Sequence, residues 1–535
     1  MQILSIRARK ARRKLRDRLR AARILHSRGD PAGHFRTFNS MVACRLESGR
    51  SSIAGVSPDE YEVCLRQKLV QSLMSSGFLG ELSRHAAAPG AVICAPVPAE
   101  WRRELSDSGV AIARLTSMIV WRWTVMRAWV AGLRRAAKLL LHSWSAQDWT
   151  GQHEQFLVLP GLSEGNLPSA SPAAQSRRDF LAWTARLRLR NGSQEVRAHV
   201  PGSQPQNLGE RVFRVSEVFP PHKTISRRVK FAAEAAVSCF LAMLDLLLAR
   251  WQRPWLLADQ LEALYASTFR WGPSAQFVFC NPNFQYRPLW TYPAAKDGSK
   301  IAFAFYSTNF QFMSTEDQSA IPLTPGYATM SWPSYLVWDE YQELFVRDAT
   351  RKSPDIRIVG SIDFVDDESV IQSPSSGQLS CAVFDVTAFQ PLIAADRGML
   401  DPYYTLDIVK AFLDDVSEGL ANAGVAMYYK RKRPFIRIAA TSYRKHVQRL
   451  VNHPNVTLVS PETSASRLAH RCDMVISIPY TSTAIVGKVE GRPSVFYDPT
   501  GKLPDDVHLA HGIPVLRGKA ELANWIAAQK SDLRR

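Results

Sequence analysis

The sequence has few cysteines, and they show no pattern. The seven are an odd number, lie far apart, and include no Cys-x-x-Cys pair and no histidine at metal-ligand spacing. We therefore expect no disulfide framework, no structural metal and a reducing compartment. The cysteines are Cys44, Cys64, Cys94, Cys239, Cys280, Cys381 and Cys472.

Long apolar runs are also missing. The chain opens with charged residues rather than with an apolar stretch of signal-peptide type, so secretion is not expected. The most apolar region, Phe231 to Ala249, contains Glu234 and Asp245 and is flanked by Lys230 and Arg250. These charges favour a buried helix over a membrane span. We expect a cytoplasmic protein.

Acidic residues are scarce: 48 Asp and Glu stand against 67 Lys and Arg, which gives a net charge of +19. Between Arg7 and Arg28 lie eleven cations and one acid, Asp17. Apolar residues in this arm, residues 1–35, recur every three or four positions and predict a basic amphipathic helix. They are Leu4, Ala8, Ala11, Leu15, Leu19 and Ala22.

Three roles fit such an arm. It can lie on an anionic membrane surface, bind nucleic acid through phosphates, or be a solvated helix. We favour the inner face of the cytoplasmic membrane, because the rest of the chain points to lipid-linked substrates.

A chain of 535 residues that is 46% apolar predicts two large domains. We place an N-terminal α/β domain at residues 36–365, a linker at 366–378 and a C-terminal domain at 379–535. The linker combines acids with Ser, Pro and Gly.

From Leu379 onward strands and helices alternate regularly, which predicts a Rossmann-like parallel sheet with right-handed crossovers. No Gly-x-Gly-x-x-Gly follows the first strand, so nicotinamide-dependent oxidoreductases are disfavoured. The expected strands are Cys381–Val386, Val425–Tyr429, Val456–Leu458, Met474–Ile478 and Ser494–Tyr497, and the expected helices are Tyr404–Ala421, Ser442–Val451, Ser464–Arg471 and Ser482–Val489.

The pattern before residue 366 is less regular. A segment rich in Pro and Gly, Pro201–Pro221, is expected to lie outside the core. Expected helices are Tyr61–Gly80, Ser117–Trp144 with its tryptophans in the core, and a pair within Arg227–Ala266; expected strands are Ala91–Ala95, Gln155–Leu159, Gln276–Cys280, Lys300–Tyr306 and Ile356–Val359.

Two polar segments follow C-terminal strands. Strand Met474–Ile478 runs into Pro479 and then Tyr480, Thr481, Ser482 and Thr483, where a helix begins. The hydroxyls can cap that helix, or its free N–H groups can bind a phosphate. Strand Val425–Tyr429 runs into the cations Lys430, Arg431, Lys432 and Arg433, which suit a diphosphate at the carboxyl edge of a sheet.

Candidate acids are fewer. Glu490 precedes the last predicted strand and is a candidate acceptor for ribose hydroxyls. Glu164, in the loop after Gln155–Leu159, is the first candidate for a catalytic base. Asp339, Glu340 and Glu343 form a second acidic group that could supply the base, but their spacing favours an exposed helix face. His453 is placed in a turn.

The run Cys472–Ala484, with its Pro-Tyr-Thr-Ser, resembles the signature of the bacterial polysaccharide-biosynthesis PFTS-motif proteins, with Tyr480 where the motif has Phe. Weaker matches are the Trp290–Asn309 region, Ile358–Ser361 and Val383–Val386. The arrangement is also similar to GT-B glycosyltransferases, in which two Rossmann-like domains face a cleft.

The resemblance implies metal-independent transfer of a sugar, from a nucleotide-sugar bound by the C-terminal domain, to a capsule or lipopolysaccharide glycan. No further cofactor is expected, and a CMP-linked donor suits a cationic cleft. Two alternatives stay open: a CDP-polyol phosphotransferase, for which His453 is a candidate histidine, and a basic nucleic-acid-binding or scaffold protein.

Overall fold

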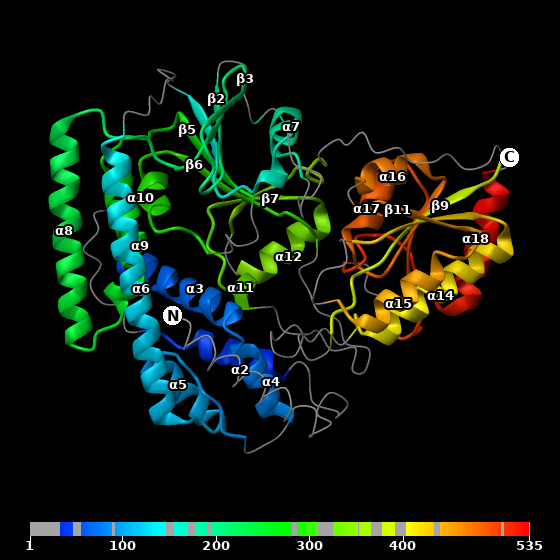
Figure 1. The fold of residues 1–535 in the computed structure, drawn as a ribbon, viewed down its shortest axis with the longest axis horizontal. Coiled ribbons are helices and arrows are strands. Elements are labelled where there is room, and N and C mark those ends of the chain that lie inside the picture. The colour runs from blue at the N-terminus through cyan, green and yellow to red at the C-terminus, as the bar shows by residue number, and fades with distance from the viewer. Residues whose placement is uncertain are drawn as a thin grey trace.

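The computed structural model describes residues 33–46, 55–87, 91–145, 155–168, 178–187, 189, 194–280, 286–308, 325–350, 353–364, 377–390, 403–432, 439–461, 463–503 and 508–533. Within these residues the chain forms two α/β domains side by side, each built on one sheet (Figure 1). The fold class expected from the sequence, two Rossmann-like domains, is confirmed.

The described part of the N-terminal domain contains an eight-stranded sheet of order β3-β4-β2-β1-β5-β6-β7-β8. All neighbours pair in parallel except β3 with β4. The strands are β1 Phe156–Leu159, β2 Glu195–His199, β3 Gln206–Gly209, β4 Val212–Val215, β5 Ala275–Phe279, β6 Lys300–Ala304, β7 Ser334–Val337 and β8 Asp355–Ile358.

Three long helices form one end of this domain. α9 is largely buried and packs against both α6 and α8, which lie side by side at the end farthest from the C-terminal domain (Figure 1). The helices described in the domain are α2 Gly33–Ala43, α3 Pro58–Ser75, α4 Phe78–Ala87, α5 Ala99–Asp107, α6 Arg114–Ser143, α7 Phe180–Arg186, α8 Ile225–Leu247, α9 Gln252–Ser267, α10 Thr291–Lys296, α11 Pro325–Ala328 and α12 Glu340–Thr350, with a 3-10 turn η2 at Glu164–Asn166.

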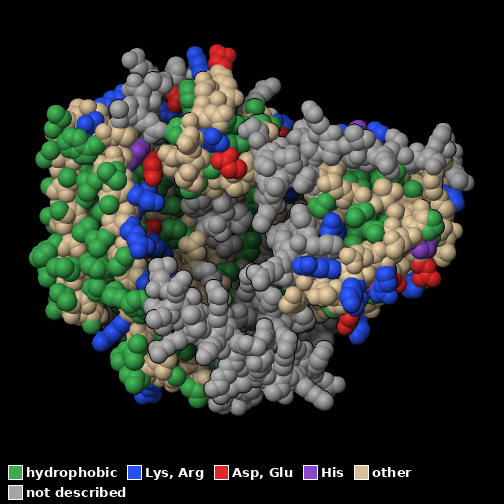
Figure 2. All heavy atoms as spheres, viewed as in Figure 1, with side chains coloured by type: hydrophobic (Ala, Val, Ile, Leu, Met, Phe, Trp, Pro, Cys, Tyr) green, Lys and Arg blue, Asp and Glu red, His purple; other side chains and the backbone are tan. Residues whose placement is uncertain are grey.

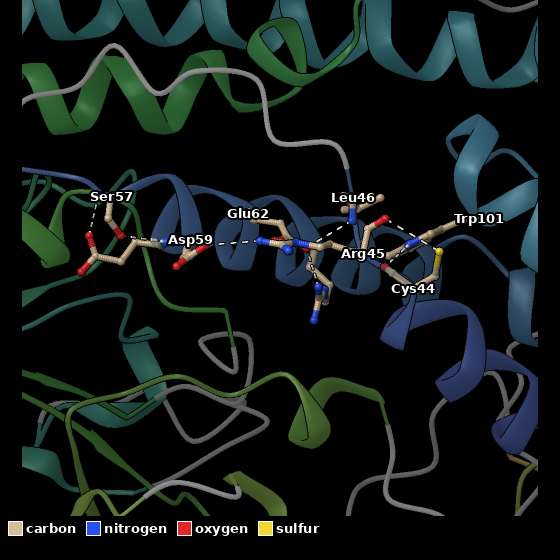
Figure 3. Close-up of polar contacts among 9 residues, drawn as sticks. Cys44, Arg45, Leu46, Ser57, Asp59, Glu62 and Trp101 are labelled. Atoms are coloured by element: carbon tan, nitrogen blue, oxygen red, sulfur yellow. Dashed lines mark hydrogen bonds and ion pairs between the residues drawn. The ribbon is translucent and has the colours of Figure 1, made fainter.

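A buried carboxylate ties the N-terminal helices together (Figure 3). Glu62 of α3 accepts hydrogen bonds from the Leu46 backbone N–H at 3.1 Å and from Arg66 at 2.6 Å. Ser57 caps α3 in a reciprocal capping box with Glu60. Because Glu62 is 6% exposed, these bonds are needed to compensate its lost hydration.

The C-terminal domain has six described strands, all parallel, in the order β11-β10-β9-β12-β13-β14. Counted along the chain this order is 3-2-1-4-5-6, the Rossmann arrangement. The strands are β9 Ser380–Phe384, β10 Ala426–Lys430, β11 Val456–Val459, β12 Met474–Ser477, β13 Ser494–Asp498 and β14 Val515–Arg517.

Helices cover both faces of this sheet (Figure 1). α14 shows how the sequence sets their limits: Thr405 accepts the first free N–H, and Gly424 ends the helix at a φ of 67°. The helices are α14 Leu406–Ala423, α15 Thr441–Leu450, α16 Ala465–Arg471, α17 Ser482–Val489 and α18 Gly518–Asp532.

α17 lies unusually close to its sheet because of one glycine. A Cβ on Gly487 would lie 2.7 Å from Val475 Cγ2 of β12 and 2.5 Å from Ser494 Oγ of β13. Only a residue without a side chain permits this approach. Gly487 therefore allows the C-terminal part of α17 to pack closely against the amino ends of β12 and β13.

Most predicted elements are confirmed. All nine elements expected from Cys381 to Tyr497 are present, as are β1, β5, β6, β8 and the α8–α9 pair. Tyr61–Gly80 is two helices, because the chain turns at Gly77, whose φ is 80°. The strand expected at Ala91–Ala95 is wrong: only Ile93 forms a bridge, to Ile112.

The Pro201–Pro221 segment supplies strands β3 and β4 at the sheet edge and, as expected, most of it lies outside the core. Two other expectations about burial are wrong. The region Phe231–Ala249 forms a helix, but with one solvent-facing apolar side, because α9 covers only the other. Trp123 and Trp144 of the α6 region are 48% and 56% exposed rather than core residues.

Two segments fall largely outside the described residues. The basic arm at residues 1–35 is described only from 33, and the linker at 366–378 only from 377. Both stay predictions. No described helix is long and apolar enough to cross a membrane.

We predict that Gly487→Val lowers the free energy of unfolding by about 1–3 kcal/mol, because the added methyls overpack the contact with Val475. Urea unfolding measures this. The control is Lys488→Val, which puts the same β-branched residue at the exposed neighbouring position. Equal losses in the two variants would show that the loss at position 487 does not come from close packing against Val475.

Candidate functional site

The strand order of the C-terminal sheet singles out one place for a ligand. The order in which successive strands are added to the sheet reverses between β9 and β12, which are parallel neighbours in the sheet but far apart in sequence. Open parallel sheets bind ligands beyond the carboxyl ends of the two strands at such a switch point. The segments that begin there are those after β9, β10, β12 and β13.

Strand register places two predicted site segments in one row. Phe384, the last residue of β9, pairs with Lys430 of β10 on one side and with Ser477 of β12 on the other. Since neighbouring strands are about 4.8 Å apart, Lys430 and Ser477 are separated by roughly 10 Å. The cations after β10 and the helix start after β12 therefore flank the same switch point.

The turn between β12 and α17 is held by its own side chains. Tyr480 has a φ of 60°, which non-glycine residues rarely adopt. Thr481 Oγ1 donates to the Ile478 carbonyl at 3.0 Å, and Tyr404 Oη donates to the Pro479 carbonyl at 2.7 Å. Such a strained but fixed turn is typical of functional sites.

The hydroxyls of this turn bond to one another rather than cap α17. Thr483 Oγ1 lies 2.9 Å from Ser477 Oγ and 3.1 Å from Thr481 Oγ1, and the side chain of the N-cap residue Thr481 accepts no hydrogen bond from a backbone N–H of the helix. The Ser482 hydroxyl has no partner among the described residues. The hydroxyls therefore do not cap α17. Its first backbone N–H groups face the carboxyl edge of the sheet without a capping side chain.

The predicted cations differ in exposure. Lys430 ends β10 and is 8% exposed, Arg431 is half-buried and Lys432 is exposed. Arg433 lies outside the described residues. Cations at this edge can neutralise phosphate oxygens, whose charge the N–H groups of α17 also attract.

Sequence reasoning missed an acid at the switch point itself. Asp385 follows β9 directly, is 3% exposed, and accepts hydrogen bonds from Tyr429 at 2.8 Å and Tyr443 at 2.6 Å. Burial raises the pKa of Asp385 to about 6, against the opposing effects of both tyrosine hydrogen bonds and of the Arg431 charge. The signal was present in the sequence, since an acid ends an apolar strand there.

A second buried acid anchors the next loop. Asp498, the last residue of β13, accepts hydrogen bonds from Tyr403 at 2.8 Å and from the backbone N–H groups of Lys502 and Leu503, both at 2.9 Å. With both oxygens engaged, Asp498 orders the rim of the site rather than offering a group to a ligand.

Glu490 lies away from this edge. Ser482 begins α17 at the carboxyl end of β12, whereas Glu490 follows its last residue, about 12 Å along the axis, near the amino end of β13. Its carboxylate accepts a hydrogen bond from Ser466 and lies 3.5 Å from His470. Glu490 does not lie near Lys430 and Ser482, because α17 returns the chain from the carboxyl edge of the sheet to the amino edge.

Glu164 lies at the corresponding edge of the N-terminal sheet. The order in which successive strands are added to that sheet reverses between β1 and β5, and Glu164 lies in the turn that follows β1. Its side chain is 55% exposed, and Oε2 accepts from Arg214 Nη1 at 3.0 Å. Oε1 has no partner among the described residues, so Glu164 has an oxygen available at this edge.

A histidine near Glu164 is structural. His199 ends β2, and its Nδ1 accepts from the Gly161 backbone N–H at 3.0 Å. Burial lowers the pKa of His199 to about 4, outweighing a hydrogen bond to the Ser216 backbone, which raises it. With both ring nitrogens engaged, His199 orders the β1 loop and is a poor candidate for proton transfer.

The two domains meet at the start of α12. Asp339 caps the helix by accepting from the Gln342 N–H, and its other oxygen lies 2.6 Å from His511 Nδ1 of the C-terminal domain. Tyr341 packs against His511, and a Cβ on Gly512 would lie 2.6 Å from Tyr341 Oη. The exposed-face expectation is therefore wrong for Asp339, because the other domain covers it.

The other acids on this helix match the expectation. Glu340 is exposed, and Glu343 pairs with Arg347 one turn away at 2.6 Å. In the described structure, neither Glu340 nor Glu343 makes a hydrogen bond or an ion pair with the C-terminal domain.

His453 lies in a turn, as expected, at the amino end of β11 and hence at the opposite edge from the switch point. Beside it an open groove of about 780 Å³ runs between α14 and α15, lined in part by Lys410, His446 and Arg449. This groove is separate from the row that holds Lys430. Among the described residues no group of three His, Cys, Asp or Glu side chains could hold a metal ion.

A protein-family model matches the second half of the chain. The family described as polysaccharide biosynthesis PFTS motif protein matches residues 242–526, more than half of the chain. A search of curated proteins finds no significant match.

Several solved structures are similar in overall form. They include the glycotransferase of kitacinnamycin (10% identity, 71% of this chain and 90% of that chain, TM-score 0.36), Arabidopsis thaliana UGT89C1 complexed with UDP-L-rhamnose (11%, 70% and 89%, 0.38) and Anabaena HepE in complex with UDP and glucose (10%, 71% and 90%, 0.35). These TM-scores are low, so the two-domain architecture is established by the sheet topology.

Asp385 should make stability depend on pH. Its folded-state pKa, about 6, exceeds the ordinary value of 3.8, so the native state holds the proton more tightly. The stabilisation that comes from protonated Asp385 is complete below about pH 4 and is lost as the pH rises through 6. The free energy of unfolding changes by about 3 kcal/mol across this window. The difference in unfolding free energy between the wild type and Asp385→Asn should fall across that window, measured by urea unfolding.

The control for this titration is Asp348→Asn, at an exposed acid on α12. Its stability should follow the wild type at every pH. A constant difference between the wild type and Asp385→Asn from pH 4 to 7 would contradict the assignment.

Proposed function

The chain belongs to the family of polysaccharide biosynthesis PFTS motif proteins, and on that premise we propose that it is a glycosyltransferase. The donor is a nucleotide-sugar, and the acceptor is a capsule or lipopolysaccharide glycan at the inner face of the cytoplasmic membrane. The basic arm, residues 1–35, is proposed to contact that membrane.

One observation carries this proposal: Lys430, Phe384 and Ser477 share a row at the switch point of a Rossmann sheet. It sets cations on one side of the switch point and the start of α17 on the other. The phosphate group of a nucleotide-sugar can bind between the cations and the start of α17. Its nucleoside can occupy the crevice beside these groups.

In the proposed reaction the acceptor hydroxyl oxygen forms a bond to the anomeric carbon while the bond from that carbon to the phosphate oxygen breaks. The nucleotide leaves with the electron pair. Lys430, Lys432 and the N–H groups at Ser482 and Thr483 stabilise its charge, so the reaction is proposed to need no metal. Glu164 takes the acceptor proton, through the carboxylate oxygen that Arg214 leaves available.

The cationic edge suits any nucleotide, including a CMP-linked acidic sugar, because its contacts are to phosphate rather than to a base. The polyol phosphotransferase alternative loses support, since His453 lies at the opposite edge of the sheet from Lys430. A nucleic-acid role for the basic arm stays a hypothesis, because residues 1–32 lie outside the described structure.

We predict that one of CMP, CDP, UDP or GDP, and not NAD, raises the thermal midpoint of the wild-type protein. A ligand at one hundred times its Kd adds about 2.7 kcal/mol, which is a shift of several degrees. Ser482→Ala should reduce the shift, and Lys430→Ala with Lys432→Ala should abolish it, because they remove phosphate contacts.

A matched control replaces two cations of the α14–α15 groove, Lys410→Ala with Arg449→Ala, and should keep the full shift. If the control loses the shift while the Lys430 and Lys432 variant keeps it, the donor site is the groove. A shift with heparin or duplex DNA alone would favour the nucleic-acid reading.

Replacing the proposed base should slow the chemical step without weakening donor binding. Glu164→Gln is expected to lower kcat for nucleotide release in the presence of acceptor by about 10²–10⁴-fold, with an unchanged nucleotide-induced thermal shift. Glu343→Gln, at an acid that is also paired with an arginine, should leave kcat unchanged. An unaltered kcat in Glu164→Gln would assign the base elsewhere.

A further inference from the structure

One side of α8 exposes an unbroken apolar stripe. Its large side chains recur at helical spacing, and each is 36–75% exposed. Scattered exposed apolar residues are ordinary, but a continuous row along a helix of about 35 Å is not. The row consists of Ile225, Val229, Val237, Phe240, Leu244, Leu247 and Leu248.

α6 extends this stripe into a wider surface. It packs beside α8 and also exposes large apolar side chains, two of them tryptophans. Figure 2 shows hydrophobic side chains gathered over both helices, with Lys and Arg side chains along the border. We call this surface the α6–α8 face; from α6 and its end it includes Leu115, Ile119, Val120, Trp123, Leu141 and Trp144.

The charge around the α6–α8 face is mostly positive. α6 contains six cations and no acid over 30 residues. Arg135 is paired with Glu217 and Glu262, but the other five have no partner among the described residues. These five are all exposed: Arg114, Arg122, Arg127, Arg134 and Lys138.

The acids of α8 do not offset this charge. Glu234 lies 3.9 Å from Lys230, and Asp245 pairs with Arg250 and Arg253. The α6–α8 face therefore combines exposed apolar side chains with surplus cations.

Exposed apolar side chains together with surplus cations favour one kind of binding partner. A second copy of the chain would bring two rows of unpaired cations together, and the basic arm would add more charge of the same sign. An anionic bilayer accepts apolar side chains and tryptophans at its interface and pairs the cations with lipid phosphates. We propose that the α6–α8 face docks on an anionic lipid surface.

This docking uses a surface at the far end of the N-terminal domain from the nucleotide-binding edge, and it does not rest on the proposed transferase activity (Figure 1). It is also separate from any contact made by residues 1–35. A protein whose donor site fails every nucleotide test can still bind membranes this way.

Vesicle flotation with the purified full chain tests the proposal. The wild type should bind vesicles of phosphatidylcholine with phosphatidylglycerol, and bind neutral phosphatidylcholine vesicles much less. Val237→Gln with Phe240→Gln and Leu244→Gln should reduce partitioning by at least about tenfold. Arg122→Gln with Arg127→Gln and Arg134→Gln should reduce binding to anionic vesicles alone, by about fivefold per cation.

The matched control changes three exposed leucines elsewhere, Leu344→Gln with Leu458→Gln and Leu533→Gln, and should bind like the wild type. Circular dichroism and the thermal midpoint show that each variant is folded. Unchanged binding by the Phe240 variant overturns the proposal and assigns the lipid contact to another segment. The proposal is also overturned if the wild type sediments as a dimer and binds no vesicles, while the Phe240 variant sediments as a monomer.

Discussion

The parallel register of β10, β9 and β12 is the constraint on which the proposed function depends. It aligns Lys430, Phe384 and Ser477 in a single row, so segments nearly fifty residues apart in sequence end together. Gly487 lets the C-terminal part of α17 pack closely against β12 and β13, and the first N–H groups of the helix lie at its other end, beside that row. Without the register the cations and the helix start would be two unrelated surface features.

Buried polar groups hold the edge in this form. Asp385 accepts hydrogen bonds from Tyr429 and Tyr443 near the cations. Asp498 orders the loop after β13, and Tyr480 adopts a strained backbone conformation at the turn into α17. Hydrogen-bonded groups of this kind fix geometry at the cost of burying charge. At the domain boundary, Asp339 and His511 add a polar contact between the domain of the proposed acceptor and that of the proposed donor.

The C-terminal fold could be predicted from the sequence because its strands are short apolar runs between well-marked helices. β2 could not, because its Glu195 and Arg197 give a polar pattern, although both side chains are buried and form an ion pair. The cations and the Tyr480–Thr483 segment were identified correctly as neighbours. Asp385 was missed although it follows an apolar strand, and Glu490 was misplaced although its position between a predicted helix and the next parallel strand puts it at the amino edge of the sheet. Periodicity likewise cannot tell whether the apolar side of α8 meets a core or another surface.

The most direct test of the account is a crystal structure of the protein with a bound nucleoside diphosphate. The account predicts phosphate oxygens within about 3 Å of the backbone nitrogens at Ser482 and Thr483, with a side chain from Lys430 or Lys432 beside them. Phosphates bound instead in the groove between α14 and α15, near Lys410 and Arg449, would contradict it and move the donor site to the opposite side of the domain.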